Sequence, residues 1–328
     1  MHTDSRVGTV FPHAFAMLWV MKAALARELA PRSYPHFDMT DVVTFEFDDR
    51  RLLHPRHHHA GAAWVTPTAR PGQPLPLLIY LHGLNRHRIH HRWMHGSVWD
   101  MRTIVGPLAI DGEIGPMAVA VPSTTSDDAF SDRTIYRTFD VAGFVEATAR
   151  ALEAQGFVID RTRVIFTAHS ASSCAERNGL FAGMGVRAAP IILNIDGCMN
   201  TRFAQVLAGA PAWQRVIVLY QDWMWRRDYS GFLAMWNRLV PQFATTPEAR
   251  SLEYYRMRGN DVHNQIVPIA LRRWLPRLVP PQQPTTTVAQ WLRGDESTPT
   301  NSTVALAEPA RALPVDDARS SQRAARGH

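Results

Sequence analysis

Residues 161–180 read RTRVIFTAHSASSCAERNGL, and this stretch decides the fold. Its residues 164–167 (VIFT) form a β-branched and aromatic run of strand length. Helix-competent residues follow at once, so the sequence predicts a strand, a tight turn and a helix. Ser170 lies at the apex of this turn, where a strained backbone lifts the side chain clear of the sheet.

The residue two positions before the apex and the residue two positions after it are both small, because larger side chains would clash in so tight a turn. They are Ala168 and Ser172. A turn of this kind with an apical serine resembles the nucleophile elbow of the α/β-hydrolase superfamily, whose usual form is G-x-S-x-G. The chain departs from that form at both glycines. An ordinary strand-to-helix turn in which Ser170 caps the helix is the alternative interpretation.

A second feature also resembles this superfamily. Residues 77–81 (LLIYL) are a continuous apolar run, typical of a buried central strand, and His82-Gly83 follows directly. In the superfamily the residue after this glycine supplies one backbone NH of the oxyanion hole. The resemblance therefore implies the NH groups of Leu84 and of Ala171, the residue after the apical serine, as the oxyanion hole.

Strand-length and helix-length segments alternate through most of the chain. Asp140 can cap a helix that Gly156 ends, and residues 264–278 form a last helix. This order predicts an α/β fold with a mostly parallel central sheet and helices on both faces, and the resemblance implies that it is the α/β-hydrolase fold. The predicted strands are residues 42–47, 62–65, 77–81, 117–121, 164–167, 191–195, 216–220 and 252–257.

Polar residues follow three of the later strands, at the sheet edge where open parallel sheets bind ligands. The resemblance implies Ser170 as nucleophile and His263 as its base. Asp196 and Asp222 are alternatives for the carboxylate that orients the base, in the chain order Ser, Asp, His. Asp222 follows the strand that more commonly carries the acid. We prefer Asp196, because Gly197 leaves its loop free to aim the carboxylate.

Residues 85–100 (NRHRIHHRWMHGSVWD) are rich in histidine and tryptophan. Their spacing matches no zinc signature, so we expect no metal site, and we interpret them as the rim and lid of a substrate cleft. The residues that we expect in this cleft are His82, Asn85, Trp93, His169 and Trp223.

Composition excludes several classes of protein. The net charge of +6 comes from scattered basic residues, so we expect no nucleic-acid partner. No uncharged apolar run of membrane-spanning length occurs, so we expect no integral membrane segment. Cys174 and Cys198 follow strands that should be neighbours, which would allow a bridge; we expect two free thiols instead.

We expect three parts in the chain: an N-terminal helical extension (1–40), a catalytic domain (41–279) and a disordered tail (280–328) rich in Pro, Ser and Thr. Residues 10–26 are apolar and resemble a signal peptide in part. Pro12, His13 and Lys22 interrupt this apolar run, so we expect that residues 15–29 form an amphipathic helix instead of part of a signal peptide. We therefore expect a cytoplasmic protein rather than an exported one.

The resemblance implies a serine hydrolase that cleaves a small-molecule ester or amide through an acyl-enzyme intermediate, without a cofactor. The alternative is a catalytically inactive protein of the same fold that serves in binding or partner recognition. A complete set of Ser, Asp and His in the superfamily's order favours the enzyme.

Overall fold

The structure is a computed structural model that describes residues 41–47, 59–97, 99–125, 127–224 and 228–281. Two sequence-based predictions lie wholly or mainly outside these residues: the N-terminal helical extension and the C-terminal tail. The division into an extension, a catalytic domain and a tail therefore stays a prediction.

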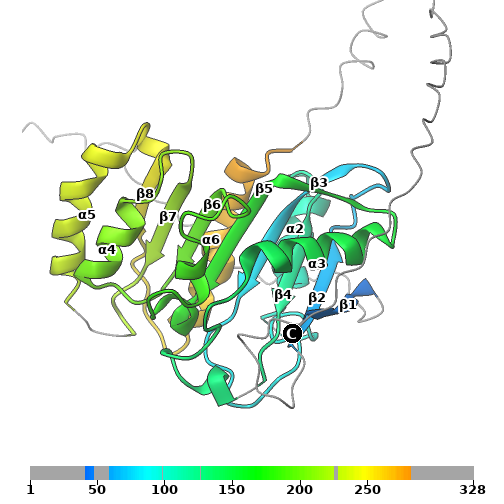
Figure 1. The fold of residues 1–328 in the computed structure, drawn as a ribbon, viewed down its shortest axis with the longest axis horizontal. Helices are drawn as coiled ribbons and strands as arrows, with labels where there is room; N and C mark the ends of the chain where they lie inside the picture. Colours follow the sequence, from blue (N-terminus) through cyan, green and yellow to red (C-terminus); the bar gives the residue numbers. More distant parts are fainter. Residues whose placement is uncertain (1–40, 48–58, 98, 126, 225–227, 282–328) are drawn as a thin grey trace, which may run out of the picture. The chain divides into compact units, whose positions relative to one another are not determined.

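Eight strands form one sheet in the order β1-β2-β4-β3-β5-β6-β7-β8 (Figure 1). Strand β2 pairs antiparallel with β1 and β4, and every other pairing is parallel. The α/β class with a mostly parallel sheet is thus confirmed. The strands are β1 (Val43–Phe47), β2 (His59–Val65), β3 (Pro74–Leu81), β4 (Ala118–Pro122), β5 (Val158–His169), β6 (Ile191–Ile195), β7 (Arg215–Tyr220) and β8 (Arg250–Tyr254).

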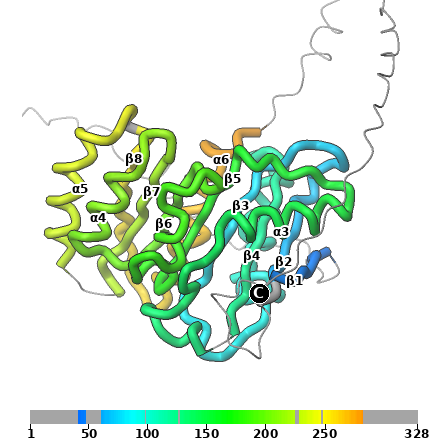
Figure 2. Tube along the Cα trace, viewed as in Figure 1, coloured from blue at the N-terminus to red at the C-terminus, as the bar shows by residue number. Residues whose placement is uncertain are grey.

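Helices cover both faces of the sheet, as predicted. Helices α3 (Val141–Glu153), α4 (Thr201–Ala208) and α5 (Ser230–Phe243) contribute to one core. Helices α2 (Met101–Ile110) and α6 (Val262–Leu278) contribute to the other. Figure 2 traces the chain from β8 into α6. Within the described residues, no helix combines the length and the apolar character that a membrane crossing needs.

Strand β3 shows why the central strands are apolar along their whole length. Leu77, Ile79 and Leu81 face one core, and Leu78 and Tyr80 face the other. Side chains alternate between the two faces of a strand, so a strand covered by helices on both sides needs apolar residues at every position.

The segment after β5 differs from the prediction of a helix. A single 3₁₀ turn, η3 (Ser170–Ser173), is followed by irregular chain and a second 3₁₀ segment, η4 (Gly179–Gly183). Serine, asparagine and glycine favour turns over helix interiors. Arg177 has φ +65° and Gly179 has φ +48°, both incompatible with a right-handed helix, and a β-carbon at position 179 would lie 2.0 Å from the Ser172 carbonyl oxygen.

Cys174 and Cys198 form a disulfide, so the prediction of two free thiols is wrong. Cys174 follows β5 and Cys198 follows β6, and these strands are neighbours in the sheet. The bridge therefore ties the loop after one strand to the loop after the next.

Removing this bridge is expected to lower the free energy of unfolding. It closes a loop with a sequence separation of 24 residues, and chain entropy predicts a contribution of about 3 kcal/mol for such a loop. Chemical denaturation of the oxidised wild type, the reduced wild type and the Cys174→Ser/Cys198→Ser double variant measures the effect. The double variant should match the reduced wild type; equal stability of all three would contradict the prediction.

Candidate active site

Ser170 follows the last residue of β5 with a left-handed backbone, φ +65°. This is the strained conformation that the sequence predicts for the apex of an elbow, and it costs about 1 to 3 kcal/mol. Ser172, where the usual motif has glycine, stabilises the turn. Its Oγ accepts from the His169 NH (3.2 Å) and lies in donor range of the carbonyls of His169 (2.8 Å) and Leu81 (3.0 Å).

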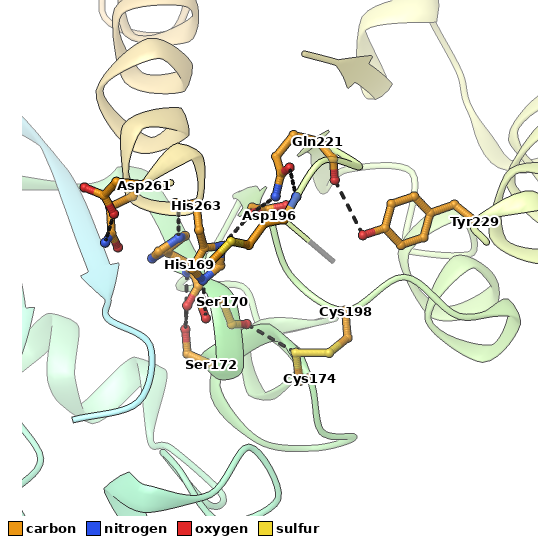
Figure 3. A network of polar contacts seen from close by, with 12 residues as sticks. His169, Ser170, Ser172, Cys174, Asp196, Cys198, Gln221, Tyr229, Asp261 and His263 are labelled. Carbon is orange, nitrogen blue, oxygen red and sulfur yellow. Dashed lines mark hydrogen bonds and ion pairs between the residues drawn. A yellow bond between two sulfur atoms is a disulfide. The ribbon is translucent and has the colours of Figure 1, made fainter. Parts of the chain in front are cut away.

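Ser170, His263 and Asp196 form a continuous hydrogen-bonded relay (Figure 3). Ser170 Oγ lies 2.7 Å from His263 Nε2, and His263 Nδ1 lies 2.5 Å from Asp196 Oδ2. A carboxylate only accepts, so Nδ1 carries the proton and Nε2 is left to accept the serine proton. The arrangement can therefore remove a proton from Ser170.

Asp196 is held from several sides. It directly follows β6, is 2% exposed, and donates its NH to the Leu219 carbonyl at 2.8 Å. Gln221 Nε2 donates to the same carboxylate oxygen that faces His263, at 2.8 Å. The sequence did not single out Gln221, although this residue directly follows β7, at the sheet edge where the other polar residues lie. At Gly197 a β-carbon would lie 2.4 Å from Ser173 Cβ, so the residue after Asp196 has no room for a side chain.

The structure brings Asp196, and not Asp222, to the imidazole. Asp222 is exposed, and its Oδ1 accepts from the Tyr254 hydroxyl at 2.8 Å. Of the two carboxylates that the sequence left open, only Asp196 contacts His263.

The backbone of the loop after β3 passes close to the serine. A β-carbon at Gly83 would lie 2.8 Å from Ser170 Cβ and 3.0 Å from its Oγ, so the loop needs glycine here. Leu84 comes next, and its carbonyl accepts from the half-buried guanidinium of Arg92. The Ala171 NH belongs to the first turn of η3, which offers it no carbonyl partner.

A cavity of about 380 Å³ opens onto the serine. Ser170, Ala171, Leu84 and Asp196 line it together with both half-cystines of the disulfide. Its remaining wall is formed by Gly197 and by residues from four other segments: Arg86, after β3; Phe130, Ser131 and Asp132, after β4; Met199; and Tyr229. Arg86 belongs to residues 85–100, which the sequence predicts as the rim of a cleft. The other wall residues come from loops and helix ends without a hydrophobic period, so the sequence contained no signal for them.

None of the five residues that the sequence placed in the cleft lines this cavity. His82, Asn85, His169 and Trp93 are buried, and Trp223 is exposed with the Arg258 guanidinium 5.8 Å from its ring centroid. Polar side chains at the end of a buried strand can form hydrogen bonds with backbone groups instead of facing a ligand.

His82 and Asn85 illustrate this. His82 Nδ1 donates to the Gly83 carbonyl at 2.7 Å, and burial lowers its pKa to about 3. The Asn85 amide donates to the carbonyls of Ile89 and Thr124, each at 2.9 Å, and so holds the loop after β3 in place. No group of side chains suited to a metal ion occurs in the part of the chain that the structure describes.

Comparison with known proteins finds no matching family model and no matching curated protein. Solved structures do match. A protein designated FAE aligns with TM-score 0.54 and 14% identity, over 76% of this chain and 90% of its own. A feruloyl esterase module from Clostridium thermocellum, complexed with sinapinate, aligns with TM-score 0.51 and 13% identity, over 72% of this chain and 86% of its own.

An enterobactin esterase from Shigella flexneri aligns with TM-score 0.50 and 14% identity, over 76% of this chain and 62% of its own. This chain thus spans less than two thirds of the enterobactin esterase. At such low identities the likeness concerns the fold, and that fold is the α/β-hydrolase fold predicted from the elbow.

Proposed function

We propose that this protein is a serine hydrolase that cleaves a carboxylic ester bond of a small molecule through an acyl-enzyme intermediate. One observation carries the proposal: the relay from Ser170 through His263 to the buried Asp196, with the serine facing a cavity. A structural serine at a strand end needs none of these features, and a binding protein does not need them together.

In the first half of the reaction, Ser170 Oγ attacks the ester carbonyl while His263 Nε2 takes its proton. Asp196 accepts from Nδ1 throughout, which keeps the imidazole in the required tautomer and stabilises the imidazolium. The tetrahedral intermediate then collapses as His263 returns the proton to the leaving alcohol oxygen. The acyl group remains on Ser170 until a water, activated by the same imidazole, releases it.

Negative charge develops on the carbonyl oxygen during each attack. The backbone NH groups of Leu84 and Ala171 are our candidates for its stabilisation, because both residues line the cavity beside Ser170. Preorganised NH donors of this kind contribute about 3 to 4 kcal/mol each in serine hydrolases. Gly83 and the Arg92 contact to the Leu84 carbonyl hold the loop that carries the first donor.

The solved neighbours support an ester in preference to an amide, since two of those with TM-scores of at least 0.50 are described as esterases. Acylation and deacylation as proposed use only protein groups and water. We therefore still predict that the reaction needs no cofactor.

Replacing the nucleophile tests the proposal. Hydrolysis of a series of 4-nitrophenyl esters by the wild type should fall by about three orders of magnitude or more in Ser170→Ala, because no other group in the relay can form the acyl-enzyme. Chemical denaturation of both proteins controls for folding. A wild type without turnover above buffer would support an inactive binding protein, and a Ser170→Ala variant with full turnover would exclude Ser170 as nucleophile.

The two aspartates provide a matched pair. Asp196→Asn should lower turnover by about four orders of magnitude, because the amide no longer fixes the His263 tautomer. Asp222→Asn should cost about tenfold or less, because it changes only an exposed bond to Tyr254. Steady-state kinetics with one ester measures both. A large effect at Asp222 with a small one at Asp196 would reassign the acid.

A further inference from the structure

His169, the last residue of β5, places a second imidazole against the relay. Its Nε2 lies 2.7 Å from the backbone carbonyl oxygen of His263, and the centroids of the two rings are 4.4 Å apart (Figure 3). The side chain is almost completely buried, at 2% exposure. Because a carbonyl only accepts, the His169 Nε2 carries a proton and donates it.

This bond connects the sheet to the start of α6. His263 is the second residue of that helix, and the N-cap residue, Asp261, makes no capping hydrogen bond with its side chain. Gly259, two residues before Asp261, has φ +133°. Because glycine adopts many backbone conformations, the chain just before the helix is not held in one of them by its own residues. The bond from His169 spans 94 residues of sequence and fixes the backbone from which the His263 ring projects.

His169 also keeps its ring uncharged. Burial lowers its pKa well below 6.5. The titratable groups that face it, His263 on α6, Arg92 in the loop before α2 and His82 after β3, act in the same direction when they are protonated, and only the hydrogen bond to the His263 carbonyl opposes them. A cation on His169 would repel the proton that His263 gains during the reaction. A buried neutral donor supplies the hydrogen bond without this cost.

We propose that His169 is a positioning residue: its Nε2–H, bonded to the His263 carbonyl, holds the start of α6 so that His263 Nε2 faces Ser170. The inference rests on the proposed function, because it assigns a role to the backbone of the proposed base. Packing is the competing role, since the His169 ring also contacts Trp93 edge to face, with centroids 5.9 Å apart.

Two substitutions separate these roles. His169→Phe keeps a ring and loses the donor, whereas His169→Gln loses the ring and keeps an amide NH at a similar reach. We expect His169→Phe to lower kcat about tenfold to a hundredfold with KM little changed, because misplacing a catalytic group affects the chemical step. His169→Gln should restore kcat to within about fivefold of wild type. Gln155→Phe, at an exposed position between α3 and the start of β5 and so at the opposite end of that strand from Ser170, is the control and should leave both constants unchanged.

An unchanged kcat in His169→Phe, or a His169→Gln variant no better than His169→Phe, would overturn the inference while leaving the proposed function intact. A wild type without Ser170-dependent turnover would overturn both. Chemical denaturation identifies a variant that does not fold.

Nitrogen NMR of the wild-type imidazoles tests the bond without any substitution. His169 should remain neutral with its proton on Nε2 from about pH 7 to 8, because burial lowers its pKa well below the ordinary histidine value of 6.5. A neutral ring with its proton on Nδ1 would leave Nε2 without a proton to donate, which would contradict the hydrogen bond and with it the inference.

Discussion

The hydrogen bond between Ser170 Oγ and His263 Nε2 joins groups 93 residues apart, and the rest of the structure makes it possible. Strand β5 lies between β3 and β6, so Ser170 emerges at the centre of the sheet edge. The left-handed backbone at Ser170 turns its side chain outward, and the close approach of Gly83 leaves room for the hydroxyl.

Parallel strands deliver their carboxyl ends to one edge, and three loops meet there. The loop after β5 carries Ser170, the loop after β6 carries Asp196, and the connection after β8 leads into α6 with His263. Polar and covalent links hold these loops together. The Cys174–Cys198 disulfide bridges the first two, and Gln221, after β7, supports the carboxylate.

The sequence predicted what depends on periodicity and on local backbone geometry. The central strands appear as continuous apolar runs, and the small flanks of Ser170 indicate the elbow. It did not predict features that depend on contacts between loops. The disulfide, the cavity wall around Phe130 and Tyr229, and the support from Gln221 all arise from segments without a repeating pattern. The helix expected after the elbow is absent because backbone angles at Arg177 and Gly179 interrupt it.

Covalent labelling tests most directly the proposed activation of Ser170 as a nucleophile by the relay. A fluorophosphonate probe, followed by peptide mapping of the labelled wild type, should place one adduct per chain on Ser170. The rate of labelling should fall strongly in His263→Ala, because the serine then lacks its base. Labelling at another serine, such as the neighbouring Ser172, or an unchanged rate in His263→Ala, would contradict the account.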